Sequence, residues 1–286
     1  MRKKDKTEDI LRARRITPGE AVLLGLVTFF AILNLFPLYW LVSNTFKYSH
    51  EITKMPPDWF PKHFNIQHYI DIFVTTDASR WLLNSFIVSV VGTLLIVLVS
   101  SMAAYAFAKL DFYGRNVLFT FFVGTLMIPK ECYTVPMFIF MRDLKLINTY
   151  TSMILPMVAL PFGTFMLKSF FEAIPNELRE SAKIDGAGEW RIFVQIILPM
   201  AKAGLGALFI LRFVAVWNDY LWQMLMAKSS DMKTMMVGIA GLMEENKPDM
   251  GRKLTGAAVS AFPMIIAFLS FQKYFTRGIS VGAVKG

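Results

Sequence analysis

The segment that decides the fold is residues 174–202, which read IPNELRESAKIDGAGEWRIFVQIILPMAK. It is a charged interruption between two long apolar runs. Pro175 suits the first position of a helix, and Glu177 falls in the first turn, where a carboxylate interacts favourably with the helix dipole. Asp185 and Gly186 form a stop signal, because glycine readily adopts the left-handed conformation that ends many helices. The pattern predicts a short helix that starts at Pro175 and ends before Asp185.

A second helix is predicted directly after Gly186. Four of its apolar residues follow the i, i+3, i+4, i+7 spacing of one helical face; they are Trp190, Phe193, Val194 and Ile197. Pro199 then breaks or kinks the chain as it re-enters apolar sequence. We therefore expect residues 174–199 to form a helix-turn-helix on the surface of a membrane protein.

The composition indicates a membrane protein. The 286 residues are 55% apolar and 18% charged, with a mean hydropathy of +0.47, whereas about 25% of the residues of a soluble domain are charged. A spanning helix needs about 20 apolar residues. Four windows without Asp, Glu, Lys or Arg meet this length: 21–46, 81–108, 146–167 and 254–272.

Two further spans are interrupted. The apolar run 116–129 is too short alone, and we expect it to continue past a Lys-Glu pair to about Pro136. The run 203–227 carries only Arg212 and Asp219. The expected fold is therefore all-α, an integral membrane protein of six transmembrane helices with the 174–199 loop between helices four and five.

The distribution of Lys and Arg predicts the orientation of these helices. Cytoplasmic segments carry an excess of basic residues, and a basic cluster precedes the first span: Arg2, Lys3, Lys4, Lys6, Arg12, Arg14 and Arg15. This places an N-terminal tail (residues 1–20), the 174–199 loop and a C-terminal tail (273–286) in the cytoplasm. Residues 21–272 would form the six-helix transmembrane domain.

Several classes of function are not supported by the sequence. The net charge of +9 is explained by basic residues that flank the spans and face anionic lipid, so we expect no nucleic-acid partner. Cys132 is the only cysteine, and the three histidines fall in one loop, so no metal site is expected. The nearest approach to a phosphate-binding loop, GRKLTG at residues 251–256, is followed by Ala where Lys is required. No catalytic nucleophile and base occur at a known motif spacing.

Charged residues within the spans are candidates for a translocation path. Arg212 and Asp219 are seven residues apart, hence on one helix face and about 10 Å apart along the axis. Intramembrane charges face a cavity or a partner. Trp217 and Asn218, beside these charges, offer an aromatic face and amide donors that would suit a polyol. Glu131, in the third expected span, is a further candidate for the path. The alternatives are that Asp219 lies at the outer interface, that Arg212 is a contact between helices, and that the aromatic residues belong to an interfacial belt.

The central loop resembles a known family. Residues 180–199 are similar to the cytoplasmic motif of ABC importer permeases, E-A-A-x-x-D-G-A followed by I-x-L-P, and the matching residues are Glu180, Ala182, Asp185, Gly186, Ala187, Ile196, Leu198 and Pro199. Ser181 stands where Ala is usual, and Ala203 where Pro is common. The segments FPLYWLVSNTFK, NSFIVSVVGTLL, VWNDYLW and RGISVGAVKG resemble the carbohydrate-uptake branch, specifically its maltose-permease G-type subunit.

This resemblance implies a permease subunit of an ATP-driven importer for a sugar or oligosaccharide. It implies four kinds of partner: a second, F-type permease, two P-loop ATPase subunits, an extracytoplasmic solute-binding protein and the lipid bilayer. ATP and Mg would bind to the ATPases, so no cofactor is expected on this chain. The location implied is the cytoplasmic membrane of a bacterium or archaeon. The residues expected to couple the chain to the ATPase are Glu180, Ser181, Ala182, Asp185, Gly186, Ala187 and Pro199.

A secondary, ion-coupled solute transporter is the alternative. Such transporters usually contain inverted repeats and carboxylates at the membrane midplane, and we find no repeat in this sequence. A membrane-embedded enzyme is a further rival, and the sequence shows no catalytic cluster for it.

Overall fold

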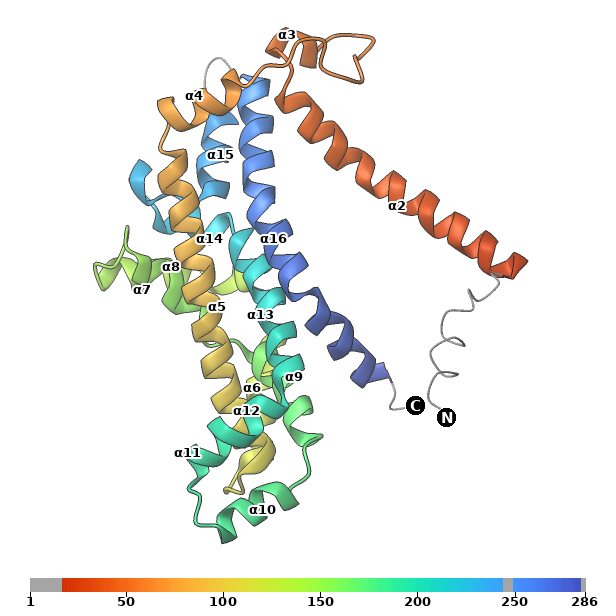
Figure 1. Ribbon diagram of the computed structural model, residues 1–286. Coiled ribbons are helices and arrows are strands. Elements are labelled where there is room, and N and C mark those ends of the chain that lie inside the picture. The colour runs from red at the N-terminus through yellow and green to blue at the C-terminus, as the bar shows by residue number, and fades with distance from the viewer. Residues whose placement is uncertain (1–16, 244–248, 284–286) are drawn as a thin grey trace. The chain divides into compact units, whose positions relative to one another are not determined.

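In the part of the chain that the computed structural model describes, residues 17–243 and 249–283, every regular element is a helix (Figure 1). The chain divides into two units, Met1–Ile66 and Gln67–Gly286. Residues 1–16 of the expected N-terminal tail and residues 284–286 of the expected C-terminal tail lie outside the described residues.

The first unit consists mainly of α2 (Pro18–Thr45), followed by the short α3 (Ser49–Ile52). Thr17 caps α2: its hydroxyl accepts a hydrogen bond from the backbone N–H of Glu20, whose carboxylate accepts one from the N–H of Thr17. The helix has 28 residues and a mean hydropathy of 2.3, enough to cross a bilayer. It matches the first expected span.

The loop after α2 is attached to the end of that helix. Lys47 donates from Nζ to Oδ1 of Asn44 (2.8 Å) and to the carbonyl of Asp58 (2.6 Å). Its ammonium group also lies 4.5 Å from the ring centroid of Trp40, within range of a cation–π interaction. These contacts attach the loop, including the segment around Asp58, to the end of α2.

The second unit contains all the remaining helices. Before the central loop they are α4 (Gln67–Thr75), α5 (Ala78–Lys109), α6 (Arg115–Gly124), η1 (Thr125–Met127), α7 (Lys130–Asp143), α8 (Tyr150–Ile154), η2 (Leu155–Met157) and α9 (Pro161–Glu172). In and after the loop they are α10 (Glu177–Ile184), α11 (Glu189–Ile192), the π-helical η3 (Phe193–Ile197), α12 (Leu198–Met200), α13 (Lys202–Trp217), α14 (Leu221–Met226), η4 (Ser230–Met232), α15 (Met235–Met243) and α16 (Met250–Ala283).

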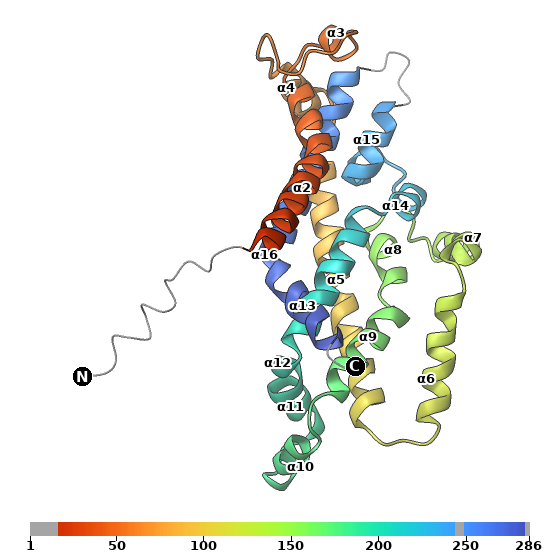
Figure 2. The same ribbon diagram turned by 90° about the vertical axis from the view of Figure 1, so that its right-hand side faces the viewer.

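Helix α5 is the centre of this unit. It packs against α9 and α13, and α13 packs in turn against α16. One apolar cluster lies near the C-terminal end of α5 and includes the buried Tyr105, Phe171 and Ile197. Figures 1 and 2 both place α10 and α11 at this end, and α4 and α15 at the opposite end.

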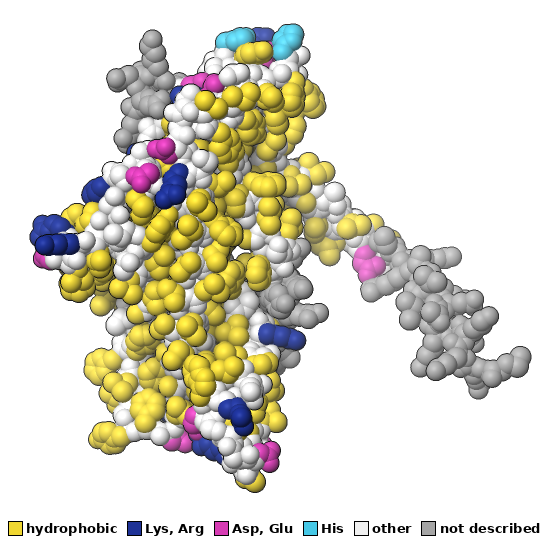
Figure 3. Space-filling view, turned by 60° about the vertical axis from the view of Figure 1, so that its left-hand side comes forward, with side chains coloured by type: hydrophobic (Ala, Val, Ile, Leu, Met, Phe, Trp, Pro, Cys, Tyr) yellow, Lys and Arg dark blue, Asp and Glu magenta, His cyan; other side chains and the backbone are white. Residues whose placement is uncertain are grey.

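Three described helices are long and apolar enough to cross a membrane: α2, α5 and the Met250–Phe271 part of α16. Two bent pairs pass the same test together, α8–η2 with α9 (50°) and α11–α12 with α13 (78°). The structure is therefore that of an all-helical membrane protein with three to five candidate spans by this criterion. On the face of the second unit in Figure 3, apolar side chains cover the middle and most charged side chains lie above or below it.

The third expected span is shorter than the sequence pattern suggested. We expected it to continue to about Pro136, but the helix ends at Met127 and α7 begins at Lys130. The break falls at Ile128, which has an extended conformation (φ −88°, ψ 113°), because a residue before proline disfavours the α region and Pro129 has no N–H to donate. Pro136 lies inside α7 instead.

The C-terminal end also differs in part from the expectation. We expected a tail from residue 273, whereas α16 continues to Ala283. Much of the expected tail is thus an extension of the last helix.

The close packing of α15 on α5 gives a test of this fold. A Cβ at Gly238 would overlap the indole ring of Trp81, which is buried and held by a 2.8 Å hydrogen bond from its Nε1 to the carbonyl of Ser230. Gly238→Ala should therefore destabilise the protein by about 1–3 kcal/mol and lower its Tm in detergent by a few degrees. Gly241→Ala, on the same helix with only Lys233 Nζ at 3.8 Å from the new Cβ, is the control. Equal Tm values for the two variants would contradict this packing.

Candidate functional site

The first candidate site is the loop that joins α9 to α13. Its first helix, α10, begins at Glu177, two residues later than expected. The carbonyl of Asn176 accepts the first hydrogen bonds, from the N–H groups of Arg179 (2.9 Å) and Glu180 (3.0 Å). Pro175 therefore precedes the helix and does not occupy its first position.

The end of α10 is a Schellman motif around Gly186. Gly186 has φ +79°, and its N–H donates to the carbonyl of Lys183 (3.0 Å), while the N–H of Ala187 donates to the carbonyl of Ala182 (2.9 Å). Ala182 and Ala187 both pack against the apolar cluster at the end of α5. The left-handed glycine predicted from the sequence is thus confirmed, and it folds the loop back onto the helices.

The second helix of the loop does not present the single apolar face that we expected. Phe193 and Ile197 are buried, but Trp190 is 63% exposed and Val194 40% exposed. The π-helical turn at Phe193–Ile197 changes the periodicity, because its i→i+5 hydrogen bonds enclose more residues per turn than an α-helix. Pro199, four residues after Gln195, cannot donate an α-helical hydrogen bond to that carbonyl.

A network of charged groups connects this loop to α5. The carboxylate of Glu189 accepts hydrogen bonds from the Tyr105 hydroxyl (2.5 Å), from Nη2 and Nε of Arg179 (2.5 and 3.2 Å) and contacts Nζ of Lys183 (2.7 Å). The Glu189 carboxylate raises the pKa of Arg179 above its ordinary value. One carboxylate therefore joins α5, α10 and α11.

A second contact joins α5 to the start of the loop. Buried Lys109, the last residue of α5, donates from Nζ to the carbonyl of Ile174 (2.5 Å) and to Oδ1 of Asn176 (2.7 Å). Lys109, Tyr105, Arg179 and Glu189 were not predicted as site residues from the sequence. Lys109 and Glu189 are charged residues at helix ends, a signal that many surface residues share, and Tyr105 and Arg179 carry no such signal.

The predicted coupling residues lie on two sides of this loop. Glu180, Ser181, Asp185, Gly186 and Pro199 are exposed, while Ala182 and Ala187 are half-buried. Apolar side chains are exposed beside them: Leu178 is 40% exposed, Ile184 87% and Trp190 63%. The loop thus packs against the helices through Ala182 and Ala187 and exposes these apolar side chains together with Glu180 and Asp185.

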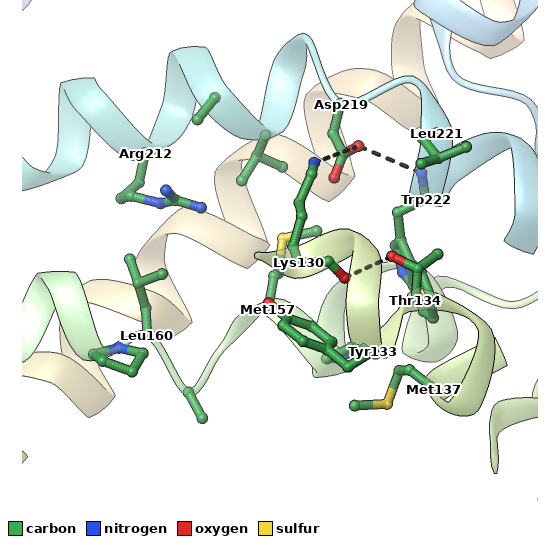
Figure 4. A pocket seen from close by; sticks show the side chains of 15 residues that line it. Lys130, Tyr133, Thr134, Met137, Met157, Leu160, Arg212, Asp219, Leu221 and Trp222 are labelled. Carbon is green, nitrogen blue, oxygen red and sulfur yellow. Dashed lines mark hydrogen bonds and ion pairs between the residues drawn. The ribbon is translucent and has the colours of Figure 1, made fainter. Parts of the chain in front are cut away.

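The second candidate site is a cavity of about 360 Å³ in the second unit (Figure 4). It is lined by residues of α7, of the segment between α8 and α9, and of α13 and α14. Among its residues are Arg212, Asp219 and Lys130, and Nζ of Lys130 lies 3.8 Å from Oδ1 of Asp219. The structure thus brings together two of the five predicted path residues.

The other three predicted path residues do not line this cavity. Trp217 is buried and donates from Nε1 to the carbonyl of Ser260 on α16 (3.2 Å). Asn218 is exposed and lies near Met264 of the same helix, 3.3 Å from Nδ2 to Sδ. Glu131 is exposed on α7. The lysine of the Lys-Glu pair in the third span, and not the glutamate, lines the cavity.

Comparisons with known proteins agree with this fold. Residues 96–281 match the family described as "Binding-protein-dependent transport system inner membrane component". The chain is 36% identical over 263 residues to the arabinooligosaccharides transport system permease protein AraQ of Halalkalibacterium halodurans, covering 90% of this chain and 94% of that protein. It is 32% identical over 255 residues to the lactose transport system permease protein LacG of Rhizobium radiobacter, covering 89% and 92%.

A solved structure has the same fold. It belongs to a bacterial ABC transporter involved in the import of the acidic polysaccharide alginate, and it matches with a TM-score of 0.78 and 22% identity over 89% of this chain and 95% of that one. The resemblance inferred from residues 180–199 is therefore confirmed at the level of the family. The chain belongs to the binding-protein-dependent transport system inner membrane components: it is a multi-pass permease subunit of an ABC importer and not itself an enzyme.

Proposed function

We propose that the chain forms one half of the membrane pathway of a sugar or oligosaccharide importer, and that residues 174–199 receive the motion of an ATPase. The carbohydrate substrates named for the AraQ and LacG relatives support the class of solute. Family membership argues against the alternative of a secondary, ion-coupled transporter, since members act in binding-protein-dependent systems.

The proposed pathway is built from six membrane-crossing segments. The three long helices and the two bent pairs supply five. The sixth is Arg115–Met127, which is apolar but short for a span; its break at Pro129 leads directly into α7. With six crossings both termini lie on the same side, which the basic N-terminal tail assigns to the cytoplasm.

One observation carries the coupling role: the loop is attached firmly to α5 and leaves an apolar surface unoccupied. Glu189 and Lys109 link the loop to α5 through the hydrogen bonds given above. On its other side Ile184 is 87% exposed, and burying such a side chain in a partner is favourable by about 1.5–3 kcal/mol. A partner that binds Ile184 and moves would therefore pull on α5.

The partner best suited to this surface is a P-loop ATPase. Glu180 and Asp185, both exposed beside the apolar surface, would meet basic residues of that subunit. The complete transporter would contain two ATPases, a second permease of the F type and the solute-binding protein, in the cytoplasmic membrane of a bacterium or archaeon. Arg212 and Asp219 would line this chain's share of the translocation path.

The left-handed residue of the loop provides the first test of this proposal. Gly186→Ala places a Cβ at φ +79° and should cost about 1–2 kcal/mol, which the loop can relieve by changing its shape. We expect at least a fivefold loss of transport-linked ATPase activity in the reconstituted complex, with unchanged insertion into the membrane.

Gly188→Ala is the matched control, two residues away. Gly188 has φ −72° and ψ 159°, a conformation open to alanine, and nothing lies within 4 Å of a new Cβ. Similar activities for the two variants, or a normal rate for Gly186→Ala, would count against the coupling role.

The link to α5 provides the second test. Glu189→Gln keeps the size of the side chain but removes the charge that Arg179 and Lys183 neutralise. Because Glu189 is partly exposed, we expect a loss of about 1 kcal/mol of local stability after solvent screening. Amide hydrogen exchange in α10 should then be about fivefold faster.

The control for this variant is Glu177→Gln, an exposed carboxylate in the first turn of α10. Its α10 exchange rates should stay within about twofold of the wild type, since only the helix-dipole interaction is weakened. If Glu189→Gln left exchange in α10 at the wild-type rate, Glu189 would not be the connection between the loop and α5.

A further inference from the structure

The cavity beside Arg212 lies where three helices are interrupted. The breaks occur at residues 128–129 before α7, 158–160 before α9 and 218–220 before α14. Interrupted backbone at membrane depth is tolerated where it is buried in protein or lines a water-filled cavity, and transporters build solute sites at such breaks. A cavity of about 360 Å³ also falls within the range of small-molecule sites, about 300–1,000 Å³.

The charges in the cavity are not balanced. Its lining includes two cations, Lys130 and Arg212, and one anion, Asp219. Asp219 is already engaged, because its Oδ1 accepts a hydrogen bond from the backbone N–H of Trp222 (3.4 Å) and lies 3.8 Å from Nζ of Lys130.

Arg212 is the group left without an acceptor. No described residue accepts a hydrogen bond from its buried Nε, and Figure 4 shows its guanidinium group extending from α13 into the space that the lining side chains surround. An unpaired buried donor of this kind is costly. Lys130 and Pro161 also begin α7 and α9 at the cavity wall, so the positive ends of two helices add to the same potential. A negatively charged group would pair with Arg212 and be favoured by both helix ends.

The rest of the lining suits a sugar. Tyr133 and Trp222 supply aromatic surface, and the indole of Trp222 is fixed by a 2.9 Å hydrogen bond from Nε1 to the carbonyl of Ser152. The C–H face of a sugar ring can pack on such surfaces, while its hydroxyl groups can bond to Thr134 and to Oδ2 of Asp219, the oxygen that neither Trp222 nor Lys130 contacts.

We infer that this cavity binds an acidic carbohydrate, with Arg212 and Lys130 on its carboxylate or phosphate group and Tyr133 and Trp222 against its ring. The inference rests on the proposed function, that the chain imports a carbohydrate, and adds the charge of the solute and the place where this subunit touches it.

The test measures the electrostatic preference of the cavity directly. Ala215, which lines it, is replaced by cysteine in a Cys132→Ser background, and the assembled transporter in nanodiscs is labelled with anionic sulfonatoethyl or cationic trimethylammonioethyl methanethiosulfonate. Val74→Cys, at an exposed position of α4, corrects for the intrinsic reactivity of the two reagents. The corrected anionic-to-cationic rate ratio at position 215 should exceed one, and Arg212→Gln should lower it about tenfold, whereas Arg212→Lys should largely preserve it.

Protection from labelling identifies the ligand chemistry. Digalacturonate or galactose 1-phosphate should slow labelling at position 215. The compound that protects better shows whether the cavity prefers a carboxylate or a phosphate. Galactobiose, the neutral control, should protect less than either. A ratio unchanged by Arg212→Gln, or equal protection by galactobiose, would overturn the inference. If this occurred while the same preparation retained coupled ATPase activity, the proposed function would stand and only the acidic-ligand assignment would fail.

Discussion

The carboxylate of Glu189 is the interaction on which the proposed mechanical role of the loop depends. It joins a residue of the central helix, Tyr105, to Arg179 and Lys183 of α10. Without it, α10 would be attached to the helices mainly through the hydrogen bond from Lys109 to Asn176 at its start and the packing of Ala182 and Ala187, two alanines that bury little apolar area. A loop that is to transmit force must be stiffer in its attachment to α5 than in its attachment to the partner, and charge-assisted hydrogen bonds from three cationic or hydroxyl groups provide that stiffness.

Backbone groups within a membrane need hydrogen-bonding partners, and this constraint explains why the helix breaks adjoin one cavity. A break facing lipid would leave polar groups unsatisfied at a cost of several kcal/mol. Here the interruptions before α7, α9 and α14 adjoin one cavity. Helix α5 is uninterrupted and packs against α8, η2 and α13, so a movement received at its loop end, as we propose, would have a direct structural route to the cavity wall.

Much of the fold followed from apolar windows and from turn chemistry. The left-handed Gly186 was predictable, because an Asp-Gly pair after an amphipathic segment has few other conformations. The extent of the third span was not, because we expected the helix to continue past Pro129 and the Lys-Glu pair, whereas the backbone breaks at residues 128–129. The π-helical turn was also beyond the sequence pattern, since a periodicity of 3.6 residues was assumed throughout.

The candidate sites were predicted less completely. Arg212 and Asp219 could be found because charges are rare within spans. Trp217 and Asn218, their neighbours along the chain, lie against α16 instead, because adjacent residues of a helix point about 100° apart. Contacts between residues distant in sequence, such as Tyr105 with Glu189, depend on the tertiary packing and left no local pattern.

The central claim is that the exposed face of α10 lies against an ATPase. A photo-crosslinking amino acid at position 184, in cells that carry the complete transporter, tests it most directly. We expect a covalent product with a P-loop ATPase subunit, and none from the same residue placed at position 74 on α4, where Val74 is similarly exposed. A transporter that remains active but yields no ATPase product from position 184 would contradict the account.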